Sequence, residues 1–170
     1  MNEQIMKANQ EVKTLTNREG KYLTFSLGRE EYGLGILKVK EIIGMMPVTT
    51  VPRTPAYVKG VINLRGKVIP VVDLRSKFDM EEIPYTERTC IIVVEIPGPN
   101  GAIPMGIVVD AVSEVLNIKG GEIEATPTFG TRLDTEYILG MAKMNGGVKI
   151  LLDIDKVLTA DELTLVGEVA

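Results

Sequence analysis

Residues 60–75 read GVINLRGKVIPVVDLR, and this stretch predicts a β-hairpin. Two runs rich in β-branched residues, 61–64 and 68–72, flank a short turn at residues 65–67. Glycine at the centre of that turn supplies the positive φ that a tight hairpin needs. Pro70 has no backbone N–H to give to a neighbouring strand, so it predicts an edge position or a bulge within the second run.

The hairpin recurs later in the chain, which indicates an internal duplication. Residues 137–154 (YILGMAKMNGGVKILLDI) repeat the pattern of residues 57–74 (YVKGVINLRGKVIPVVDL) at an offset of 80 residues (Tyr57 to Tyr137). Residues 106–116 (GIVVDAVSEVL) repeat residues 33–43 (GLGILKVKEII) at an offset of 73 residues (Gly33 to Gly106). Two blocks in the same order at similar offsets predict two copies of one small β module.

The pattern of short strands predicts the fold class. Each copy holds about five β-rich runs between glycine and proline breaks, which suits a small closed barrel because closure removes exposed strand edges. We therefore expect a mainly β protein of two five-stranded β-barrels related by internal duplication, with short helices at 74–78, at 154–158 and from Asp161. We expect a polar leader at residues 1–20. The first copy would cover about residues 21–85, the second about 86–160, and a C-terminal segment residues 161–170.

The composition excludes many kinds of enzyme. The chain has 170 residues, 45% hydrophobic and 25% charged, with no histidine and a single cysteine, Cys90. Histidine is the usual general base near neutral pH and the commonest metal ligand, so its absence excludes Ser-His-Asp and Cys-His catalytic systems and weakens any case for zinc. Carboxylates and lysines remain, but their spacing demonstrates no site. We expect no enzyme activity, no cofactor and no metal.

Other partner classes are also disfavoured. The glycines at 33 and 35 lack the third glycine of a dinucleotide motif, and residues 60–67 have one residue too many for a P-loop. Mild acidity, with a net charge of −4 and no basic cluster, argues against nucleic acid. The longest uncharged run, residues 96–109, is broken by proline and glycine, so no membrane insertion is expected. A lone cysteine fits a reducing, cytosolic setting.

Three residues have both a structural and a functional interpretation. Arg65 is either an exposed hairpin charge or a planar donor for an acidic or carbonyl-rich partner surface. Glu41 is either solvated or part of the same contact surface. Phe129 lies in a breaker-rich loop, where an aromatic side chain either packs back onto the core or contacts another protein.

Residues 60–75 resemble the CheW family of bacterial chemotaxis coupling proteins, with support from residues 31–42 and 106–115. The resemblance covers about residues 21–166. It implies two intertwined SH3-like β-barrels and a non-enzymatic adaptor in the cytoplasm, recruited to chemoreceptor arrays. Its implied partners are the regulatory domain of the histidine kinase CheA and the cytoplasmic tips of methyl-accepting chemoreceptors. The chain leaves no residues for a kinase or receiver domain, so a stand-alone coupling protein is the expected match.

The resemblance also implies functional residues. Those matching receptor-binding positions are Val39, Glu41, Gly60, Asn63 and Arg65. Those where kinase contact is implied are Ile42, Lys59 and Phe129. The alternatives are a CheW-like regulatory module of another signalling protein, a fragment of a CheA kinase, or a small-ligand-binding β-barrel.

Overall fold

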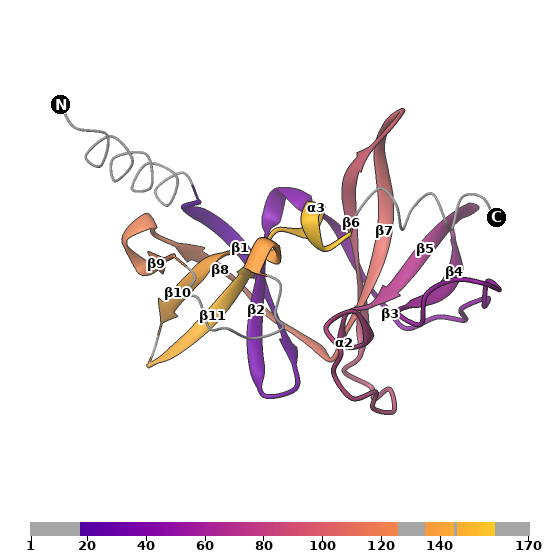
Figure 1. Ribbon diagram of the computed structural model, residues 1–170, viewed down its shortest axis with the longest axis horizontal. Helices are drawn as coiled ribbons and strands as arrows, with labels where there is room; N and C mark the ends of the chain where they lie inside the picture. Colours follow the sequence, from indigo (N-terminus) through magenta and orange to yellow (C-terminus); the bar gives the residue numbers. More distant parts are fainter. Residues whose placement is uncertain (1–17, 126–134, 145, 159–170) are drawn as a thin grey trace.

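A computed structural model describes residues 18–125, 135–144 and 146–158, and these residues are mostly β-strand (Figure 1). In the first half of the chain the strands are β1 (Gly20–Leu27), β2 (Glu30–Gly35), β3 (Val39–Gly44), β4 (Val58–Leu64) and β5 (Lys67–Asp73). In the second half they are β6 (Cys90–Gly98), β7 (Gly101–Val109), β8 (Ala111–Ile118), β9 (Ile123–Glu124), β10 (Ile138–Met144) and β11 (Gly147–Leu152). The short helical pieces are η1 (Ile36–Lys38), α2 (Leu74–Lys77), η2 (Gly120–Glu122), η3 (Thr135–Tyr137) and α3 (Ile154–Val157).

The strands form two sheets that lie side by side (Figure 1). The five-stranded sheet has the order β3-β6-β7-β5-β4 and the six-stranded sheet the order β8-β1-β2-β11-β10-β9. In each sheet the chain that follows one outer strand, β3 or β8, pairs with the opposite side of the same sheet. We therefore call the five-stranded sheet the first barrel and the six-stranded sheet the second barrel. In the first barrel Thr49 forms a bridge to Val61 of β4. In the second barrel β9 pairs with β10 at the equivalent place, Glu124 opposite Met141.

The extra strand of the second barrel is β9, and the first barrel has a similar but shorter contact at Thr49. β9 continues the path of β8 after the short turn η2, as Thr49 continues the path of β3. In the second barrel two residue pairs make the contact, and β9 counts as a strand. In the first barrel one pair makes it, and no strand is assigned. Each barrel thus has five strand paths, as the sequence predicts.

Each sheet combines strands from both halves of the chain. The first barrel takes β3, β4 and β5 from the first half and β6 and β7 from the second. The second barrel joins β1 and β2 to strands β8–β11, so indigo and orange strands lie together in Figure 1. Two parallel strand pairs join the halves of the chain. β5 pairs with β7 (Val71 opposite Gly106), and β11 pairs with β2 (Leu151 opposite Gly33). The hairpins β1–β2 and β6–β7 have thus changed places.

The hydrogen-bond register confirms the duplication. The β4–β5 hairpin has a register shift between residues 58 and 60, and the β10–β11 hairpin has one between residues 138 and 140. The Asp73 N–H donates to the Tyr57 carbonyl at 2.8 Å, and the Asp153 N–H donates to the Tyr137 carbonyl at 2.8 Å. These pairs share the offset of 80 residues found in the sequence.

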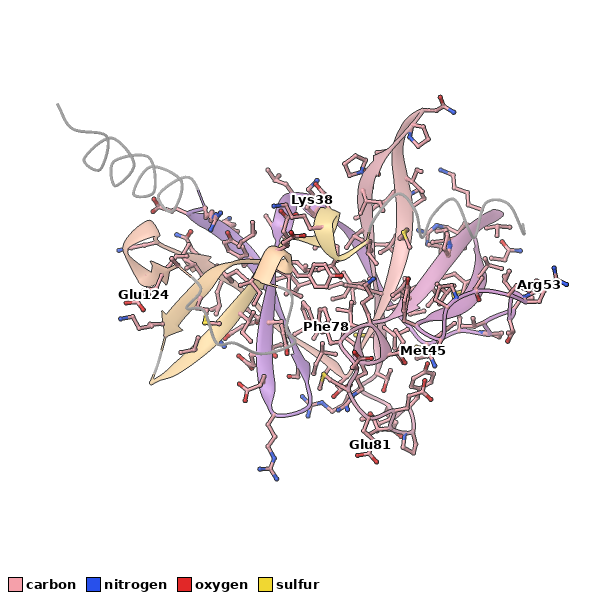
Figure 2. The ribbon with its side chains drawn as sticks, in the orientation of Figure 1. Lys38, Met45, Arg53, Phe78, Glu81 and Glu124 are labelled. Atoms are coloured by element: carbon pink, nitrogen blue, oxygen red, sulfur yellow. The ribbon has the colours of Figure 1, made fainter. Side chains whose placement is uncertain are left out.

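Three apolar cores hold the molecule together. The interior of the first barrel contains Ile62, Ile69, Val71, Ile91, Val93 and Val108. The interior of the second contains Tyr22, Ile118, Ile123, Ala142 and Leu151. The largest core joins the barrels and draws on both, from Phe25 and Leu34 to Val72 and Ile107. Rings stack through it from Phe25 to Tyr32 (5.8 Å between centroids) and on to Phe78 (6.0 Å), which lies between the sheets in Figure 2.

One local prediction is confirmed, one is wrong, and one falls outside the described residues. Helices α2 and α3 form where helices at 74–78 and 154–158 were expected. Pro70 was expected at an edge or a bulge, but β5 is an inner strand between β7 and β4, and the register shift lies at Val58–Gly60 of β4. Pro70 pairs opposite Val61, and the sheet tolerates it because the parallel ladder with β7 begins only at Val71. The helical turn expected from Asp161 lies outside the described residues.

Candidate functional site at the mouth of the first barrel

Most of the predicted contact residues lie on the two edge strands of the first barrel and the turn that follows β4. Strand β3 carries Val39, Glu41 and Ile42. Strand β4 carries Lys59, Gly60 and Asn63, and the β4–β5 turn carries Arg65. Barrel closure brings these two segments together. Phe129 lies outside the described residues.

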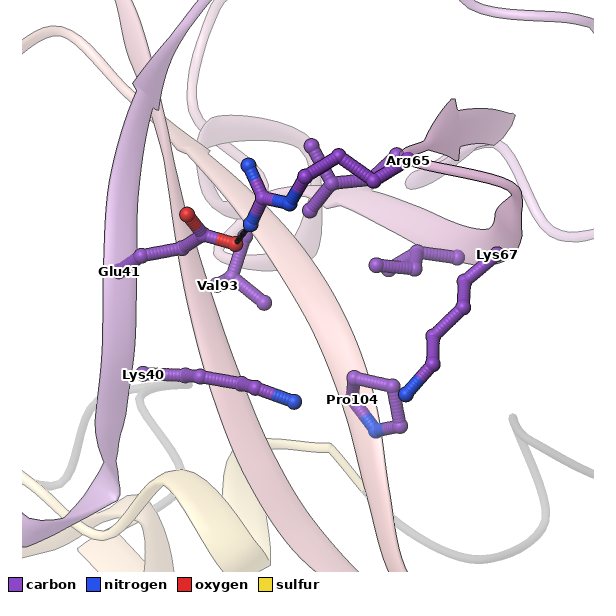
Figure 3. Close-up of a pocket in the computed structure, with 8 residues that line it drawn as sticks. Lys40, Glu41, Arg65, Lys67, Val93 and Pro104 are labelled. Atoms are coloured by element: carbon purple, nitrogen blue, oxygen red, sulfur yellow. Dashed lines mark hydrogen bonds and ion pairs between the residues drawn. The ribbon is translucent and has the colours of Figure 1, made fainter.

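Glu41 and Arg65 form an ion pair across the end of the barrel (Figure 3). The Arg65 guanidinium donates to the Glu41 carboxylate, with 69% of the arginine side chain exposed and 26% of the glutamate side chain. Arg65 has a φ of 51°, an uncommon left-handed conformation for a residue other than glycine. The Asn63 side chain holds this turn by accepting a hydrogen bond of 2.9 Å from the Gly66 N–H. Asn63 therefore acts on the shape of the turn that presents Arg65.

The ion pair lies over a small hollow, which we call the mouth of the first barrel. The mouth has a volume of about 220 Å³ and is lined by Lys40, Glu41, Leu64, Arg65, Lys67, Ile69, Val93 and Pro104. Its floor is apolar and its rim carries three basic groups against one carboxylate. Figure 3 shows the Lys40 and Lys67 side chains extending toward it, and Lys40 also lies 3.6 Å from Glu95. A floor of this kind with a charged rim suits contact with protein side chains.

A bulge explains why Val39 and Glu41, two residues apart on β3, do not face the same way. The pairing of β3 with β6 shifts register between Val39 and Glu41. A strand normally turns alternate residues to one face, and an extra residue reverses that pattern. Val39 accordingly packs against the core between the barrels, whereas Glu41 lines the mouth. Ile42 is 45% exposed on the outer surface.

Gly60 has a structural role. It is buried with a φ of 141°, and a Cβ atom there would stand 2.0 Å from the Thr49 carbonyl oxygen. Only glycine allows the chain after β3 to approach β4 closely enough to pair with Val61. Gly60 therefore offers no side chain to a partner and instead brings the edges of the site together.

Lys59 is held by an acidic residue of the loop that follows α2. Its ammonium pairs with Glu82, whose carboxylate also accepts a hydrogen bond of 3.0 Å from the Ser76 hydroxyl. Partial burial acts to lower the pKa of Lys59, but the hydrogen bond to Glu82 together with the negative charges of Glu82 and Asp73 outweighs it, and the pKa lies above its usual value. Lys59 thus stays charged and oriented at the side of the barrel.

The sequence did not identify several lining residues. Val93 and Pro104 come from β6 and β7, which join this barrel through the strand exchange. Lys40 precedes Glu41 in the sequence, and Lys67 lies two residues after Arg65. Their positive charge close to these two predicted residues could have indicated that they belong to the same site.

The CheW-like domain family matches residues 21–162. The chain is 44% identical to the chemotaxis protein CheW of Klebsiella aerogenes over 149 residues, covering 88% of this chain and 87% of that protein. It is 35% identical to CheW of Rhizobium meliloti over 150 residues, 88% of this chain and 94% of that one. The crystal structure of the scaffolding protein TtCheW from Thermoanaerobacter tengcongensis superimposes with a TM-score of 0.74 at 35% identity, covering 85% and 90% of the two chains.

The fold defines a mainly β protein built as two SH3-like barrels, the class to which the scaffolding protein TtCheW belongs. The chain belongs to the CheW family, and its function is that of a chemotaxis scaffold or adaptor. Among the described residues, no helix has the length and apolar character needed to cross a membrane.

Proposed function

We propose that this chain is a non-enzymatic adaptor that couples transmembrane chemoreceptors to the histidine kinase CheA. It would act in the cytoplasm, be recruited to membrane-associated receptor arrays, and transmit receptor state to kinase activity. The observation that carries the proposal is the gathering of Glu41, Arg65 and their neighbours at one barrel mouth in a chain of this family.

We assign the receptor contact to the mouth of the first barrel. The cytoplasmic tip of a receptor in this family is a helical hairpin, and a helix binds a groove by placing an apolar face into it. Leu64 and Ile69 line the mouth and would receive such a face, whereas Val39 packs against the core between the barrels. Arg65 would set the register by hydrogen bonds at the rim, since its planar guanidinium donates in a fixed geometry. Glu41 holds Arg65 ready in the free protein.

We assign the contact with the regulatory domain of CheA to Ile42 and Lys59, with Phe129 as a further contact. Ile42 is exposed and apolar, and Lys59 is charged and held in place by Glu82. Both lie on the same barrel as the receptor site but outside its mouth, so both partners can bind at once. Each interface can be of moderate affinity, because simultaneous binding strengthens the assembly.

Sedimentation with receptor-containing vesicles tests this function. Vesicles carrying receptor should pull down CheA only when this chain is present, and Arg65→Ala should reduce the amount of chain on the vesicles. Arg88→Ala is the matched control, because Arg88 is an exposed arginine outside the mouth. Sedimentation of CheA that does not depend on this chain would overturn the proposal. Equal loss for both variants would show a nonspecific effect of charge and overturn the role of Arg65.

A further inference from the structure

A second ion pair, between Arg75 and Asp110, lies away from the mouth and differs from the first in being largely buried. The Arg75 Nε donates to Asp110 Oδ1 at 2.7 Å, and Nη2 donates to Oδ2 at 2.6 Å. The side chains are only 12% and 21% exposed. Paired, nearly parallel hydrogen bonds between a guanidinium and a carboxylate are strong and geometrically specific.

Arg75 and Asp110 lie where the two barrels meet. Arg75 is in α2, directly after β5 of the first barrel. Asp110 is the single residue between β7 and β8, where the chain passes from the first barrel to the second. Asp110 Oδ2 also accepts a hydrogen bond of 2.8 Å from the N–H of Gly28, which lies in the β1–β2 turn of the second barrel. We call Arg75, Asp110 and Gly28 the inter-barrel clamp.

The clamp extends into the loop that carries the partner of Lys59. Arg75 Nη1 donates to the Glu81 carbonyl at 2.9 Å, and Glu81 is labelled on that loop in Figure 2. The next residue, Glu82, pairs with Lys59. One guanidinium therefore contacts the crossing point of the chain and the loop beside the proposed kinase contact.

The apolar core between the barrels cannot by itself set their relative orientation, whereas these hydrogen bonds can. Burial of apolar surface is non-directional, so it favours contact between the barrels without selecting one rotation. The bonds of Arg75 have fixed directions and would be lost if the barrels rotated. Burial acts to raise the pKa of Asp110, but the bonds from Arg75 and Gly28 outweigh it and hold the pKa below its usual value. The carboxylate is therefore ionised under ordinary conditions.

We propose that the Arg75–Asp110 pair fixes the orientation of the first barrel relative to the second, and that both are positioning residues for signalling. The signalling part rests on the proposed function, since the proposed kinase contact Lys59 pairs with Glu82 in the loop that Arg75 also binds. Loss of the Arg75–Asp110 pair would change the position of that loop. The orientation part stands on the geometry alone.

Distances between two spin labels in the isolated protein test this proposal without any partner. Val68 and Val148 are equivalent by the 80-residue repeat, exposed, and on different barrels, so Val68→Cys and Val148→Cys provide the labelling sites in a Cys90→Ala background. The unchanged clamp should give one narrow distance distribution. Arg75→Ala should broaden or shift it, and Asp110→Asn should do so to a smaller extent because its amide oxygen can still accept from Gly28.

The controls separate orientation from stability. Arg75→Lys keeps the charge but loses the paired geometry, and it serves if Arg75→Ala does not fold. Lys143→Ala removes an exposed ion pair with Glu124 within the second barrel, and it should leave the distances unchanged. A lower melting temperature with unchanged distances in the Arg75 variants would overturn the proposal, as would unchanged distances with unchanged stability. If the chain failed to bind receptor or kinase, the proposed function would fail while the distance result stood.

Discussion

The Thr49 carbonyl oxygen occupies the place where a side chain at residue 60 would begin. A Cβ atom at Gly60 would lie 2.0 Å from that oxygen, and the backbone around it cannot move without breaking the bridge between Thr49 and Val61. This bridge closes the first barrel and brings β3 beside β4. The contact between Gly60 and Thr49 is therefore a condition for the mouth and its Glu41–Arg65 pair.

Gly60→Ala should destabilise the protein by about 2–4 kcal/mol, because the change combines a steric clash with an unfavourable positive φ. Gly66→Ala is the matched control, since Gly66 also has a positive φ, of 86°, but a Cβ atom there would meet nothing within 4 Å. It should cost about 1 kcal/mol. Chemical denaturation measures both values. Equal losses would show that the contact with Thr49 is unimportant.

Arg65→Ala should change the free energy of unfolding by less than about 0.5 kcal/mol, because the side chain is mostly exposed. The same variant should weaken binding to a receptor-tip fragment by about tenfold, because arginine is among the residue types that carry most of the binding energy of an interface. Calorimetric titration and a thermal melt provide the two numbers. A variant that unfolds, or one that binds normally, would contradict the role given to Arg65.

Substitutions at Asp73 test whether its side chain caps the N-terminus of α2. Asp73 is 5% exposed, and its side chain accepts a hydrogen bond of 2.9 Å from the Arg75 N–H. Asp73→Ala should cost about 1 kcal/mol by removing this cap, while Asp73→Asn should cost less because the amide oxygen can accept the same bond. Urea denaturation compares them, and an equal cost for the two variants would argue against the cap.

Asp73 and Asp110 should affect the acid stability of the protein in opposite directions. Burial raises the pKa of Asp73, so the folded state binds that proton more tightly and its contribution to stability is lost as pH rises through the folded pKa. The pKa of Asp110 is lowered despite its burial, because Arg75 and Gly28 donate to it. Its contribution is present above the unfolded pKa, near 3.8, and is lost as pH falls through the folded pKa.

The pH dependence of unfolding measures this difference. Compared with the unchanged chain, Asp110→Asn should lose less stability between pH 5 and pH 3, about the range where these carboxyls titrate. Asp73→Asn should lose more over the same range, because the stabilising protonation of Asp73 is absent. Parallel curves for both variants would contradict the opposite roles.

The sequence predicted the local structure well because hairpins and helix starts depend on residues close together in the chain. The β4–β5 hairpin, its repeat, and the helices after Asp73 and Asp153 are all present. Strand partners could not be predicted in the same way. The repeat shows that β2 and β7 are equivalent, but an equivalent strand fits either barrel, so periodicity does not reveal that the two hairpins change places.

The candidate site was predictable in part for the same reason. Glu41 and Arg65 belong to one copy of the repeat, and the family resemblance linked them. Val93 and Pro104 reach the mouth only through the exchange, and Asp110 meets Arg75 for the same reason. Gly60 was predicted among the receptor-binding residues because the motif contains it, and the structure adds the backbone contact that a motif cannot show.

The measurement that tests the central claim most directly is the rate of CheA autophosphorylation in the presence of receptor-containing vesicles, with and without this chain. The account predicts that a receptor ligand changes the rate only when the chain, the receptor and the kinase are all present, and that Arg65→Ala reduces this response while Arg88→Ala preserves it. The same ligand response without the chain, or no response with all three present, would contradict it.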